Sequence, residues 1–251
     1  MGSMRTLLTL CLFAGWTLTA PLSGQDAPAI DRGLPKANLN NAASDASRSN
    51  VRWSLFNKGF AGDDFFLGQD GERWVIDKIR VWAVPGTQSE DPPNLGDVYQ
   101  DVRLYFGDDG GALTPVLSGR LKRGGNQTNE RRIRITDAAA EGVLPYDDFG
   151  LMLRIWQIDF SGLDLAVEGG RKYRFGVWGL GRPVVGKEHK IYPWFTHGSN
   201  AALSEARQDG ADGRLLTFDS SGSSDGEFDS NGNAWNKSSD LNVQVFARRV
   251  E

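Results

Sequence analysis

Cysteine is almost absent from this chain of 251 residues: Cys11 is the only one, and it lies near the amino terminus. If the amino-terminal segment is removed, the remaining chain contains no thiol. That chain then has no means of forming disulfides, thiolate nucleophiles or cysteine-ligated zinc sites. Its stability must come from an ordinary hydrophobic core, which a domain of about 200 residues is long enough to build.

Histidine is also scarce, since His189 and His197 are the only two. Neither belongs to an HExxH metal motif, and the chain has no G-x-S-x-G nucleophile elbow and no P-loop. His197, near Trp194, is typical of a hydrogen-bonded loop histidine. Glycosidases need two carboxylates about 5–10 Å apart, and 32 acidic residues leave no pair singled out. The sequence therefore predicts that the protein is not an enzyme. A glycan-active enzyme is kept as the least favoured of the three functions considered for it.

The chain has no excess of basic residues and no long hydrophobic run. Lys and Arg number 28 against 32 Asp and Glu, which gives a net charge of -4 and a pI near 5.3. This balance argues against a general nucleic-acid or anionic-membrane ligand. The apolar stretch from Leu7 to Ala14 is too short to cross a bilayer. Because Arg5 precedes it and small residues follow it, we expect residues 1–24 to be a signal peptide of a secreted, extracellular or periplasmic, protein.

Other interpretations of the amino-terminal region stay open. Residues 1–24 could be a buried core segment, and Leu8 to Cys11 is superficially similar to a lipobox, although Leu10 is large for the position before a lipidated cysteine. Residues 25–48 are rich in Ala, Asn, Ser and Pro without a period, which predicts a flexible linker. The alternative is that part of this linker adds an edge strand. We expect one folded domain over residues 49–251.

The rest of the chain is organised around the stretch from Gly59 to Gly86. Its run from Trp74 to Val84 is rich in β-branched and aromatic residues, with turn residues on both sides, which predicts a strand. A strict two-residue period does not hold within the run, because it would place Trp74 and Ile76 on one face and Ile79 and Val81 on the other. A one-residue β-bulge near Asp77 and Lys78 restores a single buried face. That face would hold Trp74, Ile76, Ile79 and Val81.

Short strand patterns separated by turns continue along the chain, and 31 glycines supply many of the turns. The expected strands cover residues 98–106, 131–136, 149–160, 171–180, 191–195, 215–218 and 240–250. No long stretch has a helical period. The pattern predicts an all-β protein, an antiparallel β-sandwich.

The central pattern resembles a signature of secreted bacterial jelly-roll domains. Asp63-Asp64-Phe65 and the W-x-I-x-x-I-x-V pattern from Trp74 to Val81 are similar to the ADDF…W-x-I-x-x-I motif of domains that often occur in PEP-CTERM proteins. Residues 102–117, 169–179 and 239–246 are similar to later segments of that family. The resemblance implies a jelly-roll β-sandwich, sometimes inferred to bind carbohydrate, and brings no catalytic residues. No sorting tail of the PEP-CTERM type closes this chain.

Aromatic residues are the first candidate for a binding site. Carbohydrate sites place flat aromatic faces against sugar C–H surfaces. Alternation directs Trp82 and Trp178 outward, and with Tyr105 they would form a platform on one sheet. Trp194, in an aromatic segment with loop character, completes the predicted ligand-binding set. The alternative is that a neighbouring loop covers Trp82 and that most of the other tryptophans belong to the core.

Acidic turns are the second candidate. Calcium takes six to eight oxygen ligands, which Asp, Glu, Asn and backbone carbonyls on a glycine-rich loop provide. The tract of residues 219–233 predicts a structural Ca²⁺ site formed by Asp225, Glu227, Asp229 and Asn231. The alternative is a solvated loop. The pair Asp63-Asp64 has an alternative of its own, in which the side chains cap turn amides before the central strand.

Together these patterns favour a secreted, non-catalytic binding module for extracellular or cell-envelope carbohydrate. The main alternative is a structural or adhesive surface protein that binds protein partners or itself. The sequence points to no nucleic-acid partner and leaves the oligomeric state open.

Overall fold

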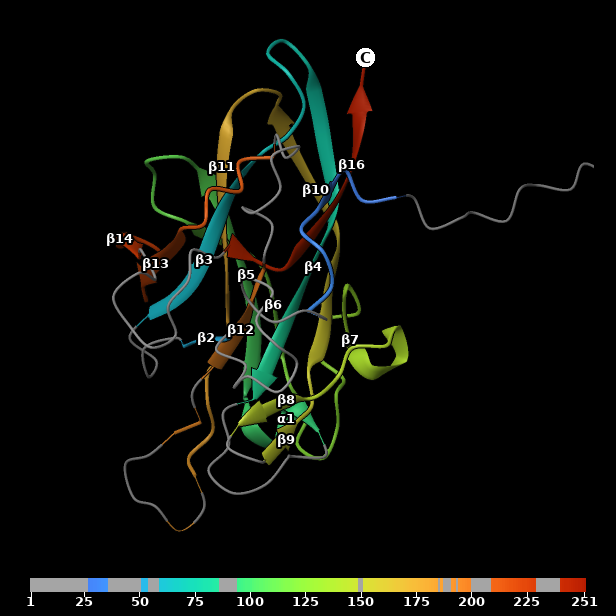
Figure 1. Cartoon of the computed structure of the whole chain (residues 1–251), viewed down its shortest axis with the longest axis vertical. Coiled ribbons are helices and arrows are strands. Elements are labelled where there is room, and N and C mark those ends of the chain that lie inside the picture. Colours follow the sequence, from blue (N-terminus) through green and yellow to red (C-terminus); the bar gives the residue numbers. More distant parts are fainter. Residues whose placement is uncertain are drawn as a thin grey trace, which may run out of the picture.

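The computed structural model describes residues 27–35, 51–53, 59–85, 94–148, 151–184, 186, 191–192, 194–199, 209–228 and 240–251. Within these ranges the side chains of residues 51–53, 146–148, 151 and 225–228 are outside the description. The described chain forms two antiparallel β-sheets packed face to face (Figure 1). The predicted all-β antiparallel sandwich is therefore confirmed, while the jelly-roll order of its strands stays a prediction.

The first sheet has eight strands among the described residues. Its main path runs through β1 (Ile30–Asp31), β16 (Val243–Val250), β4 (Arg73–Pro85), β10 (Trp156–Glu168) and β7 (Ile133–Asp137). A second branch starts where β12 (Trp194–Ser199) pairs with the end of β4, and also contains β2 (Val51–Trp53) and β15 (Asp240–Leu241).

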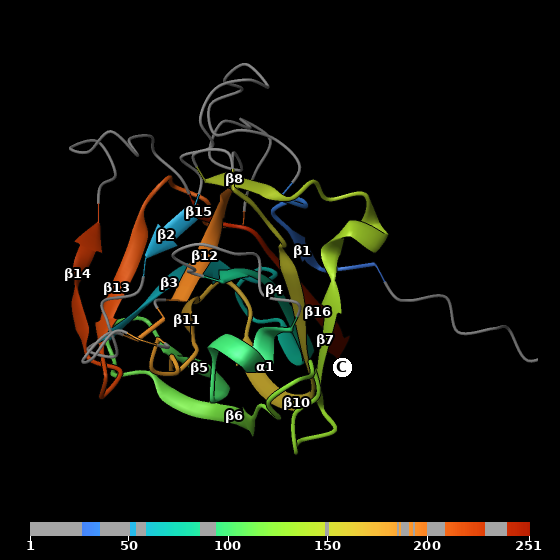
Figure 2. The same cartoon turned by 90° about the horizontal axis from the view of Figure 1, so that it is seen from below.

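The second sheet has six strands among the described residues and faces the first across the core (Figure 2). Its order is β14 (Ser224–Phe228), β13 (Leu215–Asp219), β3 (Gly59–Phe66), β11 (Lys172–Trp178), β5 (Asp101–Asp108) and β6 (Thr114–Arg120). The smaller elements are the hairpin β8 (Tyr146–Asp148) with β9 (Leu151–Leu153), the helix α1 (Leu95–Val98) and the 3-10 turn η2 (Ala138–Glu141).

The predicted bulge in the central strand is confirmed. Lys78 pairs with Phe246 and Ile76 with Ala247, so Asp77 is left out of the register between β4 and β16. Ile76 and Ile79 therefore both face the core and are fully buried. Each side chain buried in this way contributes about 1.5–3 kcal/mol. Trp74 and Val81 pack against the same core.

The prediction of a flexible linker over residues 25–48 needs correction for residues 27–35, where the alternative of an edge strand is confirmed. Ile30 pairs with Val245 and is buried in the core. The Ala29 and Arg32 amides donate to the carbonyls of Val245 and Val243, at 2.8 and 3.0 Å. Local composition favoured a linker because the partners of this segment lie at the other end of the chain. Residues 1–24 and 36–48 lie outside the described residues.

None of the helices in the described ranges has the length and apolar character needed to cross a membrane.

Candidate functional site

A row of polar side chains crosses the outer face of the first sheet, on the side away from the core. The pairing registers align one residue from each of five neighbouring strands. This polar row consists of Asp31, Gln244, Arg80, Asp159 and Arg134. Cross-strand neighbours on one face of a sheet lie close enough for their side chains to interact.

Arg80 is at the centre of the polar row. Its Nε donates to Oδ1 of Asp159 at 2.6 Å and one terminal nitrogen donates to Oδ2 at 2.9 Å, which makes the pair bidentate. The other terminal nitrogen donates to Gln244 Oε1 at 3.3 Å, and Gln244 Nε2 donates to Asp31 Oδ1 at 3.2 Å. The hydrogen bonds to Asp159 raise the pKa of the Arg80 guanidinium above its ordinary value. Paired groups of this kind hold each other in fixed positions.

The next row along the strands carries an aromatic ring. Phe246 lies opposite Lys78, and the Lys78 Nζ is 3.5 Å from the centroid of the Phe246 ring. The Arg80 guanidinium carbon is 5.5 Å from the same centroid. Phe246 is half-buried, so part of the ring faces solvent. Two cations over one ring are a cation–π arrangement that orients the ring on the sheet.

Residues 138–148 and 151–155 form a cap over one end of this outer face. Trp82 packs beneath the cap against Ala138, Val143, Leu153 and Ile155, and is 1% exposed. Its neighbours Val81 and Ala83 belong to the core between the sheets. Trp82 thus points outward as predicted, but the ring is covered, which confirms the alternative of a covering loop. Glu141 of the cap adds electrostatic attraction to Arg80 and so lies near the polar row.

The predicted platform of Trp82, Tyr105 and Trp178 on one sheet is wrong. Trp82 belongs to the first sheet, whereas Tyr105 and Trp178 belong to strands of the second. Tyr105 stacks on Phe60 with the ring centroids 4.3 Å apart, and Phe60 lies 6.1 Å from Trp178. These rings form a buried cluster separate from the main core, with Tyr105 4% and Trp178 6% exposed. The alternation of side chains along a strand predicts which face of its sheet a residue lies on. It does not predict which sheet the strand joins or which segments cover that face.

Trp194, the fourth predicted ligand-binding residue, is also buried. It begins β12 and packs in the main core, with its ring centroid 4.8 Å from that of Tyr99. His197 lies in the same strand rather than in a loop and is buried. Its Nδ1 is 2.8 Å from both Gly198 O and Asn242 Oδ1. The sequence predicted a strand over residues 191–195 but also gave Trp194 and His197 loop character, because the partners that bury them are distant in sequence.

The predicted calcium ligands fall largely outside the description. Asp225 and Glu227 belong to β14, but their side chains are not described, and Asp229 and Asn231 lie outside the described residues. In the part of the chain that is described, no group of three or more His, Cys, Asp or Glu side chains is placed to hold a metal ion. The calcium site stays a prediction.

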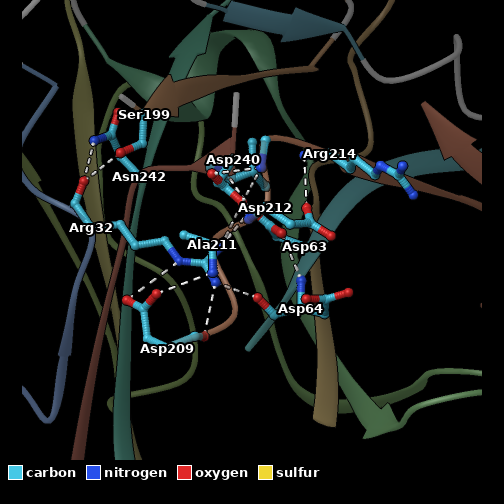
Figure 3. Close-up of polar contacts among 12 residues, drawn as sticks. Arg32, Asp63, Asp64, Ser199, Asp209, Ala211, Asp212, Arg214, Asp240 and Asn242 are labelled. Atoms are coloured by element: carbon cyan, nitrogen blue, oxygen red, sulfur yellow. Dashed lines mark hydrogen bonds and ion pairs between the residues drawn. The ribbon is translucent and has the colours of Figure 1, made fainter. Parts of the chain in front are cut away.

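A buried ionic centre around Arg32 was not predicted (Figure 3). The Arg32 side chain has no solvent exposure. Its guanidinium lies 2.9 Å from the Asp63 carboxylate, 3.5 Å from that of Asp240 and 3.8 Å from that of Asp209. It also donates to the backbone carbonyl of Asp64 at 2.5 Å. One cation therefore faces three carboxylates from three separate segments.

Backbone amides stabilise these carboxylates. Asp63 accepts from the amides of Leu241 at 2.5 Å and Asp64 at 2.7 Å, and Asp240 accepts from Gly213 at 3.2 Å. Asp63 thus binds backbone amides as its alternative interpretation supposed, but not those of the turn before β4. Burial raises the pKa of Asp63 well above its ordinary value and also raises that of Asp240.

The ionic centre joins the amino-terminal segment to the rest of the sandwich. The Arg32 carbonyl accepts from Ser199 Oγ at 2.5 Å and from Asn242 Nδ2 at 3.2 Å, while its side chain holds Asp63 and Asp240. Because the Arg32, Asp63 and Asp240 side chains are sealed from solvent, we assign this centre to the architecture of the protein. The Asp63-Asp64 pair was the only signal in the sequence that pointed to it.

Comparison of this chain with family models, with curated proteins and with solved structures finds no match.

Proposed function

We propose that this protein is a secreted, non-catalytic binding module for extracellular or cell-envelope carbohydrate, and that it binds on the outer face of the first sheet. The observation that carries the proposal is the half-buried ring of Phe246, part of which faces solvent, beside the hydrogen-bonded polar row. Secretion rests on the signal-like pattern of residues 1–24.

Carbohydrates present two kinds of surface, and this face offers a partner for each. The aliphatic face of a sugar ring packs on an aromatic ring. The Lys78 Nζ covers one face of Phe246, so a sugar would pack on the part of the ring that Lys78 leaves open. Sugar hydroxyls exchange hydrogen bonds with polar groups at the surface, and Arg134 of the polar row is exposed there. Arg80, Asp159 and Gln244 are nearly buried and hold each other in place, so they order the face beneath the ligand. A face ordered before binding loses little side-chain entropy when the ligand arrives.

The other candidate faces support the proposal less well. Tyr105 and Trp178 lie in a buried cluster, so their rings have little surface to offer a ligand. The Arg32 centre is closed to solvent. The outer face of the first sheet therefore combines a partly exposed ring, Phe246, with an ordered polar row that ends in the exposed Arg134.

The test is a glycan array probed with the protein purified from a secreting host, in calcium buffer and again with EDTA. We expect selective binding that Phe246→Ala reduces at least tenfold, about 1.4 kcal/mol. Phe66→Ala is the matched control. Phe66 is also half-buried, and the Lys172 Nζ lies 5.5 Å from its ring centroid, but it belongs to the second sheet.

Two results would count against the proposal. If the folded protein binds no glycan, the carbohydrate function is wrong, and self-association at rising concentration would then favour the structural or adhesive alternative. If Phe66→Ala and Phe246→Ala weaken binding equally, the binding face is wrong. Loss of binding in EDTA would support the predicted calcium site.

A further inference from the structure

We infer that residues 27–35 are an exchangeable segment, which fills either the slot in its own chain or the same slot in a second copy of the chain. The slot is the part of the sandwich that holds β1 and the Arg32 side chain. The inference goes beyond the proposed function, since it concerns self-association and needs no glycan. The partner is a second copy of this chain.

The slot is selective for this segment. Its apolar part takes Ile30, which pairs with Val245 and is buried in the core. Its ionic part takes Arg32, whose guanidinium lies within 3.8 Å of three carboxylates (Figure 3). Its polar part is Asn242, whose Nδ2 donates to the Gly33 carbonyl at 2.9 Å. An occupant therefore needs an extended backbone, an apolar side chain and an arginine two residues later, and a second copy supplies all three in the right order.

A slot without its segment is unfavourable, so every copy needs one. Asp63 and Asp240 would stay buried without a cation, which is strongly destabilising. The edge of β16 would lose its neighbour, and an open strand edge is a template for pairing with another chain. The contacts are the same whichever copy supplies the segment, because the strand partner of Ile30 and the ionic partners of Arg32 lie far from the segment in sequence.

The segment leaves the slot with little damage to the sheet. Its strand β1 has two residues and is at the end of the main path of the first sheet, next to β16. Departure breaks this one pairing and leaves the order of the other described strands intact. Exchange of an identical element between two copies is a low-cost route to a dimer.

The connection from the segment to β2 is longer than its span requires. Gly33 accepts a hydrogen bond from Asn242, whose Oδ1 is 2.8 Å from His197 Nδ1. His197 in turn pairs with Val51 at the start of β2. The two ends of the connection are therefore near each other in space, although fifteen residues, 36–50, join them. Fifteen residues extend to roughly 50 Å, which is enough to reach a neighbouring molecule.

Concentration decides which slot the segment fills. A tether of this length holds its segment at an effective concentration on the order of 1 mM. A dilute chain therefore fills its own slot, whereas a second copy competes once the protein concentration approaches about 1 mM. Reciprocal exchange closes into a symmetric dimer. We expect monomers near about 10 μM and a large share of dimers near about 1 mM.

The experiment introduces single cysteines into the Cys11→Ser chain, which has no other cysteine. Asp31→Cys labels the segment and Gln244→Cys labels the slot, because these two residues are cross-strand partners. Such partners lie within the Cα separation that a disulfide needs. The two variants are mixed in urea, refolded at about 10 μM and at about 1 mM, oxidised and separated on non-reducing gels. A disulfide between the two kinds of chain requires the segment of one in the slot of the other.

Two control pairs measure disulfides that do not report exchange. In the first, Ser118→Cys replaces Gln244→Cys. Ser118 is exposed in β6 of the second sheet, away from the slot, so this pair measures random collisions. In the second, the donor chain carries Arg32→Met beside Asp31→Cys. Its segment has no charge to offer the carboxylates and should lose the competition for the slot.

We expect at least ten times more mixed disulfide from Asp31→Cys with Gln244→Cys than from either control pair at about 1 mM, and little at about 10 μM. Equal yields from all three pairs would mean that the segment stays in its own slot, and the inference would be wrong. A second measurement needs no cysteine: the wild-type chain refolded at about 1 mM should sediment partly as a dimer. A monomer at both concentrations would also overturn the inference.

Discussion

The guanidinium of Arg32 lies 2.9 Å from the carboxylate of Asp63, and both side chains are sealed from solvent. Arg32 follows the edge strand β1, whereas Asp63 lies within β3 of the opposite sheet. The pair therefore joins the amino-terminal segment to the second sheet through the interior. Asp240 and Asp209 add two further carboxylates to the same cation.

Arg32→Met should destabilise the protein strongly. The substitution leaves Asp63 and Asp240 buried without a cation, and breaking a buried pair in this way costs about 3–5 kcal/mol. Urea unfolding followed by tryptophan fluorescence measures the loss. Asp63→Asn introduced into Arg32→Met should recover part of it, because the second change removes a charge that has lost its partner.

Arg132→Met is the matched control. Arg132 pairs with Glu130 at 3.1 Å on the surface, where such pairs contribute about 0–1 kcal/mol. Equal losses for Arg32→Met and Arg132→Met would show that the buried centre does not stabilise the fold as described.

The ionic centre also predicts a pH dependence of stability. Burial raises the pKa of Asp63, and its attraction to Arg32 is too weak to reverse this. A carboxyl whose pKa is higher in the folded chain contributes stability that is complete below the unfolded pKa, about 3.9. That contribution is lost as the pH rises through the folded pKa. The unfolding free energy of wild type relative to Asp63→Asn should therefore fall as the pH rises from about 4 toward neutrality.

Glu130→Gln tests a carboxyl whose pKa shifts in the opposite direction from that of Asp63. A hydrogen bond from the Arg132 side chain lowers the pKa of Glu130, so its contribution is present above the unfolded pKa and lost as the pH falls through the folded value. Unfolding free energies measured from about pH 2.5 to pH 8 should therefore show the Glu130 difference rising with pH up to the unfolded Glu pKa, about 4.3, and the Asp63 difference falling above about pH 3.9. Slopes of the same sign would contradict the charge arrangement around Asp63.

Gly176→Ala should destabilise the second sheet. A Cβ at Gly176 would collide with the Phe60 ring, which is stacked between Tyr105 and Phe218 and has little room to move. Overpacking of this kind costs about 1–3 kcal/mol. Thermal and urea unfolding measure the effect.

Gly111→Ala is the control for a glycine without such contacts. The nearest atom to its added Cβ is the carbonyl oxygen of Asp108, 3.7 Å away. This variant should be neutral or stabilised by about 0.4–1 kcal/mol, because the unfolded chain loses freedom. A Gly176→Ala variant as stable as Gly111→Ala would mean that the Phe60 ring does not lie over the sheet at this point.

Trp82→Ala should reduce stability and leave ligand binding intact in the folded protein. The ring fills the space beneath the cap, so its removal leaves a cavity that costs about 3–5 kcal/mol. Met152→Ala, at an exposed side chain of the same cap, should change stability by less than about 0.5 kcal/mol. If Trp82→Ala abolished glycan binding without loss of stability, the ring would have to be a ligand contact and the cap would have to open.

The features predicted correctly from the sequence depend on local rules. The bulge at Asp77 follows from the positions of Ile76 and Ile79, because only one extra residue lets both face the core. Trp82 and Trp178 lie on outer faces of their sheets, as alternation requires. Residue spacing sets these features within a single strand, so no knowledge of distant contacts is needed.

The candidate site could not be predicted in this way. The polar row takes one residue from each of five strands, and register between strands depends on pairing that spacing within one strand does not specify. Phe246 was read as part of a closing strand, and nothing local showed that Lys78 would lie over its ring. The four residues predicted to bind the ligand are buried; they are Trp82, Tyr105, Trp178 and Trp194.

Local patterning of the chain was thus enough to specify an antiparallel sandwich, its central strand and the face of most strand residues, because a two-residue period acts within each strand. Tertiary structure decided the rest. It placed Trp82 and Trp178 in different sheets, covered both, and brought Arg32 from a segment with the composition of a linker into contact with Asp63 and Asp240. The physical reason is that burial and charge pairing depend on segments that are far apart in sequence and meet only in the folded protein.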